Sequence, residues 1–271
     1  MPELPEVETT LRGVSPLVTG RTVENMLVRN YSLRHPVDKT LPRRLLGQRL
    51  VEVERRAKYL FFRFSELNLI WHLGMSGSMR VNQASVDPAT HDHIDVVFDN
   101  NQCLRYRDPR RFGLVLWTAE EPNDHKLIRH LGPEPWDAKF DGDYLHRLAR
   151  GRKLAVKNFI MDGKIVVGVG NIYASESLHL AGIDPRRAAS RISEKRFARL
   201  VVAIREVLDL AIAKGGTTLR DFAKTDGQPG YFRHELNVYD RAGEACHECG
   251  ALIKQIVIGQ RSSYYCPNCQ R

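Results

Sequence analysis

Two hydrophobic patterns divide the chain. From residue 23 to residue 117, apolar residues come in short runs separated by turn residues such as Asp99-Asn100-Asn101. Short runs rich in Val, Ile, Phe and Tyr at this spacing predict the antiparallel strands of a sandwich or barrel. We expect one short helix through Val7, Leu11, Val14 and Leu17, followed by strands over 23–28, 49–53, 59–64, 69–72, 94–98, 104–106 and 114–117.

Helical spacing replaces the strand pattern in the second half of the chain. The change falls at Gly132-Pro133-Glu134-Pro135-Trp136, so we place a domain boundary there. We expect helices over 154–161, from 171 to near 182, and over 197–211, with Asn171 as a possible cap of the second helix. The fold class is therefore α+β multidomain, with an antiparallel β-sandwich and flanking helices over 1–132, a helical domain over 133–235 and a ribbon over 236–271.

The strongest single signal is the cysteine spacing at the end of the chain. Cys246-x2-Cys249 and Cys266-x2-Cys269 are separated by 16 residues, whereas the fifth cysteine, Cys103, lies in a predicted strand as a buried, inert thiol. Two Cys-x2-Cys pairs at this spacing place four thiolates around one Zn²⁺, and a site with four protein ligands is structural. We expect a two-stranded ribbon between the pairs, with Gln260 and Arg261 at its tip.

Composition narrows the kind of partner. The 271-residue chain is 42% hydrophobic and 27% charged, so it is globular. Its net charge of +9 favours a polyanionic partner, although a solvated basic surface is the plainer alternative. No apolar run approaches the ~20 residues of a membrane span, and the acidic start does not fit a signal peptide. We therefore expect a cytoplasmic protein with no membrane partner.

The first residues of the chain, 1–6, place reactive groups at its start. Removal of Met1 would leave Pro2 with a free secondary amine, whose pKa of about 7.7–8.0 leaves part of it neutral near pH 7. Such an amine attacks a carbonyl carbon and forms a cationic iminium. Glu3 and Glu6 are close enough in sequence to move protons around the adduct. The alternative is that these acids simply open a helix.

Several other segments do not fit plain strands or helices. Segment 55–58 holds three cations, segment 72–77 brackets Met75 with two glycines, and segment 107–113 combines a proline, arginines and Phe112. Arginines bind phosphates and an inserted aromatic ring can enter a base stack, so the last segment is a candidate wedge. The alternative for segment 55–58 is a charged strand end, and the alternative for the other two segments is packing in the core. We expect a helix start after Gly168-Val169-Gly170 to be an anion site or only a tight turn, and 226–230 to be a gating loop.

Together these segments resemble formamidopyrimidine-DNA glycosylase, the bacterial repair enzyme family for oxidised purines. The resemblance covers the whole chain in order. It rests on 2–6, Lys58, 72–77, 108–113, 168–176 and the four-cysteine ribbon with Arg261. The family implies a helix-two-turns-helix in the helical domain, DNA in the cleft between the halves, a structural zinc and a monomer that works on double-stranded DNA at the nucleoid.

The resemblance also implies roles for individual residues. The implied catalytic residues are Pro2, Glu3, Lys58 and Arg261, with Glu6 in support. Pro2 would attack C1′ of the damaged nucleoside, and two eliminations would then cut the strand on both sides. The implied phosphate clamp consists of His72, Lys157, Asn171 and Arg261. The space left by the extruded base would be filled by Met75, Arg110 and Phe112. Further implied DNA contacts are His91 and Arg111.

Two competing functions stay open at this point. A sister branch for oxidised pyrimidines shares Pro2, Glu3 and Lys58, but it usually has glycine where this chain has Leu4, and it lacks the Met/Arg/Phe set. A non-enzymatic zinc-ribbon DNA-binding protein fits the charge and the ribbon equally well. That alternative gives no reason for a Pro-Glu pair at the start of the chain.

Overall fold

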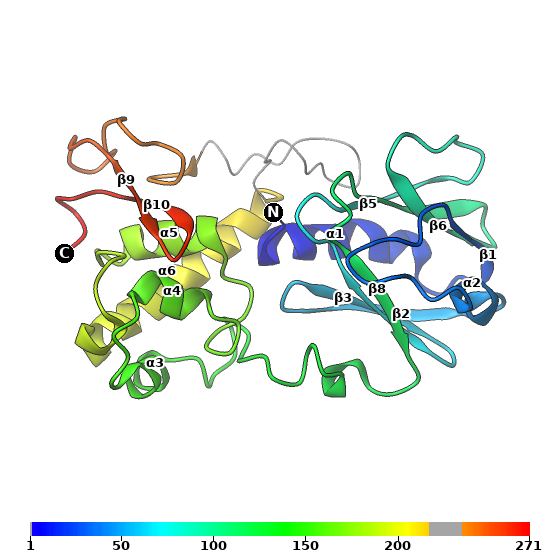
Figure 1. Ribbon diagram of the computed structural model, residues 1–271, viewed down its shortest axis with the longest axis horizontal. Helices are drawn as coiled ribbons and strands as arrows, with labels where there is room; N and C mark the ends of the chain where they lie inside the picture. The colour runs from blue at the N-terminus through cyan, green and yellow to red at the C-terminus, as the bar shows by residue number, and fades with distance from the viewer. Residues whose placement is uncertain (1, 217–234) are drawn as a thin grey trace. The chain divides into compact units, whose positions relative to one another are not determined.

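The computed structural model describes residues 2–216 and 235–271, which divide into two compact units (Figure 1). Among these residues, one unit holds 2–129 and 214–216, and the other holds 130–213 and 235–271. The loop expected over 226–230 and the initiator Met1 lie outside the described residues. No helix in the described part is long and apolar enough to cross a membrane.

Two four-stranded antiparallel sheets form the first unit and confirm the predicted sandwich. One sheet has the order β1-β6-β7-β5 and contains Val23–Val28, Asp92–Phe98, Gln102–Arg107 and Ser78–Gln83. The other has the order β2-β3-β4-β8 and contains Leu50–Arg56, Tyr59–Phe64, Asn68–His72 and Leu114–Thr118. Every predicted strand is present, and most extend one to three residues beyond the expected ends.

Strand β5 is the one that the hydrophobic pattern missed. It lies at a sheet edge and pairs only with β7, and of its six residues only Met79 is buried. An edge strand buries few side chains, so its sequence, Ser-Met-Arg-Val-Asn-Gln, carries almost no apolar signal. The short helix α2, Leu41–Leu45, was also not predicted.

Helix α1, Leu4–Val18, contributes to the same core as both sheets (Figure 1). Its buried positions include Val7, Val14 and Val18, whereas Leu17, which the helical spacing had placed on the apolar face, is 43% exposed. The helix contacts β2, β3, β5 and β7. Burial of this face fixes the direction of the helix, and therefore fixes where the start of the chain lies within the unit.

The second unit combines helices with a β-ribbon. The helices are α3 Gly142–Ala149, α4 Val156–Met161, α5 Asn171–Leu180 and α6 Glu194–Ala213, and the ribbon pairs β9 Lys254–Ile258 with β10 Arg261–Tyr265. Short 3-10 turns complete the chain at Pro122–Asp124 in the first unit and Ala189–Arg191 in the second. A small separate core lies under the ribbon and includes Val238, Ile253 and Tyr264.

The expectation that Asn171 caps α5 is wrong. Gly170 is the N-cap residue, and Asn171 is the first residue of the helix. The Asn171 side chain instead bonds outward to Lys157 and to the Ser262 carbonyl. A capping side chain must turn back to its own backbone, so these two long-range partners exclude that role.

Candidate active site

The start of helix α1 is a capping box built from two buried acids. The Glu3 amide donates to Glu6 Oε2 at 2.8 Å, and the Glu3 side chain accepts from the Glu6 amide. Each glutamate is only 2% exposed. The acids therefore do open a helix, as the structural alternative proposed. The same bonds fix the Glu3 backbone one peptide bond from Pro2, which is also buried.

Gly216, distant in sequence but in the same unit, lies close to the Glu6 carboxylate. Its φ is +82°, and a Cβ added there would come within 2.9 Å of Glu6 Oε1. Only glycine combines this left-handed backbone with so close an approach. The contact places Gly216 against the start of α1.

Lys58 lies in a two-residue turn that is fastened to α1. The turn joins β2 to β3, and its first residue, Ala57, has φ +56°. A non-glycine residue in this region carries strain of roughly 1–2 kcal/mol. Arg55 holds the turn in place, because it donates to the Ala57 carbonyl at 3.0 Å and to Glu8 of α1 at 2.8 Å. Strain maintained by surrounding bonds is typical of functional positions.

His72, at the end of β4, is a neutral hydrogen-bond donor. Its Nδ1 accepts the Gly74 amide at 2.9 Å, which leaves the proton on Nε2. Burial lowers the pKa of His72 to about 4, helped by the positive charges of Lys58 and Arg34 and opposed by Asp108. The ring packs 4.9 Å from Tyr59. At neutral pH the side chain can thus offer Nε2–H to an acceptor without adding charge.

Asp108 joins the two loops that carry the predicted void-filling residues. Its carboxylate, which is fully buried, accepts from Ser76 Oγ at 2.7 Å, from the Tyr106 hydroxyl at 3.0 Å and from the Gly113 amide at 2.8 Å. Ser76 Oγ in turn accepts the Arg110 amide at 3.1 Å. The two loops are therefore one hydrogen-bonded body.

Glycines allow these two loops to touch through their backbones. A Cβ at Gly74 would lie 2.4 Å from the Phe112 carbonyl carbon, and one at Gly113 would lie 1.8 Å from the Tyr106 hydroxyl. Gly74 also has φ +72°. Side chains at these positions would force the loops apart, so the glycines set the spacing between Met75 and Phe112.

The predicted void-filling side chains lie outside the buried core. Phe112 is 45% exposed, and the Arg110 guanidinium lies 4.9 Å from its ring centre. Met75 is half-buried, and Arg111, at φ +57°, is exposed. His91 is exposed as well, and its carbonyl accepts the Asp108 amide at 3.1 Å. Two loops that are joined by hydrogen bonds and present exposed apolar and cationic side chains fit insertion into a duplex better than core packing.

In the second unit, Lys157 lies where α4, α5 and the ribbon meet. Its Nζ bonds to Asn171 Oδ1 at 2.6 Å, to Ser263 Oγ at 2.6 Å and to the Ser262 carbonyl at 3.2 Å. Asn171 Nδ2 also donates to the Ser262 carbonyl, at 2.9 Å. Lys157 is fully buried in the unit. Its three ammonium hydrogens thus each have an oxygen acceptor, so a positive charge is held where the two helices and the ribbon meet.

The ribbon tip places Arg261 beside this cluster. Gly259 and Gln260 form a two-residue turn with φ of +55° and +64°, as a tight hairpin requires. The tip rests on α4, since a Cβ at Gly259 would lie 2.2 Å from Asn158 Nδ2. Arg261 follows the turn and is exposed, as the sequence predicted for the ribbon tip.

The four predicted metal ligands converge at the base of the ribbon. All four sulfur atoms lie within 4.8 Å of one another, with 3.4 Å between Cys249 and Cys266 and 4.0 Å between Cys246 and Cys269. Four sulfurs at about 2.3 Å from a tetrahedral Zn²⁺ would be separated by about 3.8 Å. The donor set therefore fits zinc.

Family models match three successive parts of the chain. They are described as the formamidopyrimidine-DNA glycosylase N-terminal domain (residues 1–115), the formamidopyrimidine-DNA glycosylase H2TH domain (131–223) and the zinc finger found in FPG and IleRS (243–271). Formamidopyrimidine-DNA glycosylases of Alkalilimnicola ehrlichii and Methylococcus capsulatus are 58% and 55% identical, with both chains of each pair covered completely. The chain belongs to the formamidopyrimidine-DNA glycosylase family.

Solved structures of family members share the whole architecture. A Lactococcus lactis FPG mutant in complex with Fapy-dG-containing DNA is 31% identical over the full length of both chains, with a TM-score of 0.92. A MutM structure in complex with DNA containing carbocyclic 8-oxo-G is 32% identical over both full chains, with a TM-score of 0.91. The helical domain is thus a helix-two-turns-helix domain, and the four-cysteine ribbon is a zinc finger with one structural zinc.

The predicted site residues of this formamidopyrimidine-DNA glycosylase family member form two groups by unit: those up to Phe112 lie in the first unit, and the others, from Lys157 onward, lie in the second. Two further residues have roles in the architecture that the sequence did not reveal. The sequence had indicated both only as members of longer segments, 108–113 for Asp108 and 168–176 for Glu176. Glu176, buried in α5, accepts the amides of 237, 238 and 239 at 2.8, 2.9 and 2.8 Å and so fastens the start of the zinc finger to α5.

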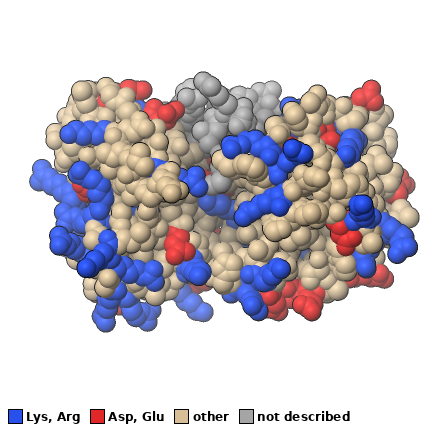
Figure 2. Space-filling view, in the orientation of Figure 1, with Lys and Arg blue, Asp and Glu red and all other residues tan. Residues whose placement is uncertain are grey.

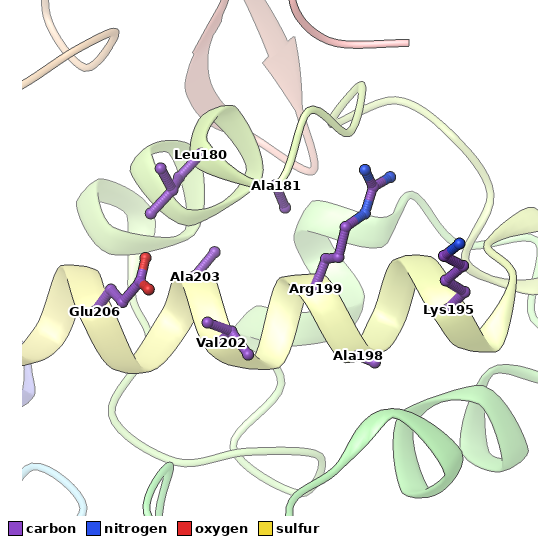
Figure 3. A pocket seen from close by; sticks show the side chains of 8 residues that line it. All are labelled: Leu180, Ala181, Lys195, Ala198, Arg199, Val202, Ala203 and Glu206. Atoms are coloured by element: carbon purple, nitrogen blue, oxygen red, sulfur yellow. The ribbon is translucent and has the colours of Figure 1, made fainter.

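One groove on the described surface lies apart from both groups. It has a volume of about 490 Å³ and runs along α6 (Figure 3). Its lining is mainly aliphatic, with Lys195, Arg199 and Glu206 among its polar residues. None of the predicted site residues lines it, so the groove is not the candidate active site.

Proposed function

We propose that this chain is a bifunctional base excision repair enzyme. It removes oxidised purines, 8-oxoguanine and formamidopyrimidines, from double-stranded DNA and then cleaves the resulting abasic site. The observation that carries the proposal is the buried capping box that fixes Glu3 and Glu6 beside Pro2. Related solved structures are complexes with DNA that contains Fapy-dG, an abasic site or carbocyclic 8-oxo-G, and they support the substrate class.

Pro2 acts as the nucleophile. Its amine attacks C1′ of the damaged nucleoside, the N–C1′ bond forms, and the glycosidic bond breaks as the base leaves with a proton. The sugar ring then opens between C1′ and O4′, and Glu3 supplies the proton that O4′ takes up. The product is a cationic iminium between Pro2 and C1′.

The iminium drives both strand cuts. It withdraws electrons from the sugar, so a proton at C2′ is lost and the 3′ phosphate leaves by β-elimination. A second, δ-elimination releases the 5′ phosphate and leaves a one-nucleotide gap. Lys58, held beside α1 by the Arg55–Glu8 bond, supplies a proton or holds the phosphate nearest the lesion. Glu6 orders the site through the Glu3 amide.

The remaining predicted residues hold and distort the duplex. His72, Lys157, Asn171 and Arg261 bind phosphates, and Arg261 also counts as catalytic because it fixes the phosphate of the reacting nucleotide. His91 and Arg111, both exposed, contact the backbone near the wedge. Chemistry at C1′ needs the nucleotide outside the stack. Met75, Arg110 and Phe112 fill the space that the extruded nucleotide leaves.

The domain division and the location follow from the same proposal. We divide the chain into a catalytic domain over 1–132, a helix-two-turns-helix domain over 133–235 and a zinc finger over 236–271. A basic repair enzyme for chromosomal DNA works at the nucleoid, as a monomer on one lesion.

Borohydride trapping on a panel of duplexes tests the proposal. Borohydride reduces an iminium and makes the protein–DNA link permanent. We expect trapping with 8-oxoguanine and formamidopyrimidine duplexes, at a rate well above that with oxidised pyrimidines, and none with undamaged duplex. A non-enzymatic binder would give no adduct with any duplex. Preference for oxidised pyrimidines would move the chain to the sister branch.

A further inference from the structure

Cations are concentrated on the helical part of the second unit. Residues 142–199 contain twelve lysines and arginines and five acidic residues, so this stretch carries most of the chain's net charge of +9. Lys and Arg side chains gather over the end of the unit formed by α3 and the first turns of α6 (Figure 2). Of the twelve cations, only Lys157 belongs to the proposed phosphate clamp.

Backbone pairing brings two basic segments side by side. The Ser190 amide donates to the Arg152 carbonyl at 3.1 Å, and the Val156 amide donates to the Arg187 carbonyl at 2.8 Å. Arg152 and Lys153 on one segment therefore lie next to Arg187 and Arg191 on the other. All except the half-buried Arg187 are exposed.

The first turns of α6 extend this cluster. Lys195 and Arg199 are one helical turn apart, and both side chains rise from the side of α6 that faces Ala181 (Figure 3). Between them in sequence, Arg196 bonds to the Gly182 carbonyl. Burial lowers the pKa of Arg196, and so do the nearby charges of Arg187 and Arg199. We define the basic face as Arg152, Lys153, Arg187, Arg191, Lys195 and Arg199.

Acidic residues are outnumbered around the basic face, with five against twelve cations over residues 142–199. Asp184 is bound by Arg186 at 2.6 Å, and Glu194 is an exposed residue in the first turn of α6. Like charges held this close together destabilise the folded unit. A polyanion that binds the face reverses that effect, because each phosphate contact also releases a condensed counterion.

We propose that the basic face binds the phosphate backbone of a second DNA duplex while the clamp holds the first. The choice of DNA as partner rests on the proposed function. Binding here is independent of sequence, because exposed flexible cations contact phosphates and do not read bases. A protein that holds two duplexes at once passes directly from one to the other, and this speeds the search for rare lesions.

Transfer between duplexes tests the proposal, with a matched control. The face variant is Lys153→Gln, Arg191→Gln and Lys195→Gln. The control variant is Arg21→Gln, Lys39→Gln and Arg43→Gln, three exposed cations of the first unit. The full-length, zinc-loaded protein is bound to a labelled 13-base-pair duplex with an abasic-site analogue. Its dissociation rate is then measured at rising concentrations of unlabelled, undamaged duplex.

We expect the dissociation rate of the wild type and the control variant to rise with competitor concentration. The slope of dissociation rate against competitor concentration should fall roughly fivefold or more in the face variant. This slope should also depend less on salt, since three phosphate contacts are lost. Trapping on the short lesion duplex should be unchanged in both variants. A slope that is equal in the face variant and the wild type, or equally reduced in the control, would overturn the proposal. Failure of trapping in the wild type would instead refute the proposed function.

Discussion

The start of α1 and the zinc finger are both small, and they are ordered by different means. Residues 2–6 are ordered locally, by a capping box between Glu3 and Glu6. The zinc finger is ordered by its metal ligands and by bonds to distant residues, such as the Gln270 side chain on the Ile183 carbonyl at 2.9 Å. The start of the chain contains the proposed nucleophile, and the zinc finger contributes part of the proposed DNA-binding surface.

This contrast predicts two separable kinds of failure. Blocking the Pro2 amine should abolish catalysis and leave the fold and DNA binding intact, because the core of the first unit does not depend on that amine. A change at a zinc ligand should unfold the ribbon as a whole, because such modules fold only with metal. The first unit, with its own core, should keep its structure.

The largest effect is expected from blocking the amine of Pro2. A protein that keeps Met1, or that carries an N-terminal tag, has no free secondary amine and should give no borohydride adduct with 8-oxoguanine duplex. Affinity for an uncleavable lesion analogue should remain, because the clamp is untouched. The matched control is the same tagged protein after cleavage that leaves Pro2 first. Full trapping by the uncleaved protein would refute the role of Pro2.

Loss of a zinc ligand should have the next largest effect. In Cys246→Ser, unfolding of the ribbon removes Arg261 and disturbs the Ser262 and Ser263 contacts of Lys157. Two charged contacts are worth about 3–6 kcal/mol, so DNA affinity should fall by about 100-fold or more. Zinc content and fluorescence anisotropy measure the two losses.

The control for this variant is Cys103→Ala, which removes the buried thiol of β7. Burial raises the pKa of that thiol to about 12, which fits an inert group. Zinc content and DNA affinity should not change in the control. A zinc-free Cys246→Ser protein that binds lesion DNA normally would contradict the assignment.

Phe112→Ala should separate activity from stability. Because Phe112 is 45% exposed, the melting temperature should hardly change, whereas single-turnover excision from duplex should slow by roughly 10-fold or more through loss of an aromatic stacking contact of about 1–3 kcal/mol. Cleavage of a preformed abasic site should suffer less. The matched control is Phe62→Ala, a 1% exposed core residue, which should cost about 3–5 kcal/mol of stability. Equal melting losses in the two variants would place Phe112 in the core.

Arg110→Ala should relax the choice of the opposite base. The guanidinium only donates hydrogen bonds, so it pairs with the O2 and N3 acceptors of cytosine and not with the amine of adenine. Excision opposite cytosine should fall toward the rate opposite adenine. Single-turnover rates against both bases measure the ratio, and an unchanged ratio would argue against contact with the orphaned base.

The smallest expected effect concerns pH and His72. Its pKa is about 4 in the folded protein and about 6.5 when unfolded, so the unfolded chain takes up a proton first as pH falls. The stability that neutral His72 contributes is therefore complete above pH 6.5 and is lost between pH 6.5 and pH 4. His72→Gln should flatten the urea-unfolding profile in this window. A profile with the wild-type slope would mean that His72 titrates normally.

Local patterns predicted most of the fold and the four-cysteine metal cluster. Strand runs, the Cys-x2-Cys spacing and the Pro-Glu start are short-range signals, and the structure bears out the sandwich and the metal cluster. Strand β5 was missed because an edge strand needs few apolar residues. Asn171 was misassigned as a cap because its true partners, Lys157 and Ser262, are 14 and 91 residues away. Glu176 had no assigned role for the same reason, because the amides that it binds are 61 to 63 residues away.

We propose above all that the reacting group is the amine of Pro2, with Glu3 and Glu6 held beside it by the capping box. The most direct measurement is mass spectrometry of the borohydride-trapped adduct after protease digestion. We expect the DNA remnant to be attached to the N-terminal peptide, at Pro2, in a protein that has lost Met1. Attachment to Lys58 or to any other lysine, or the absence of an adduct with 8-oxoguanine duplex, would contradict it.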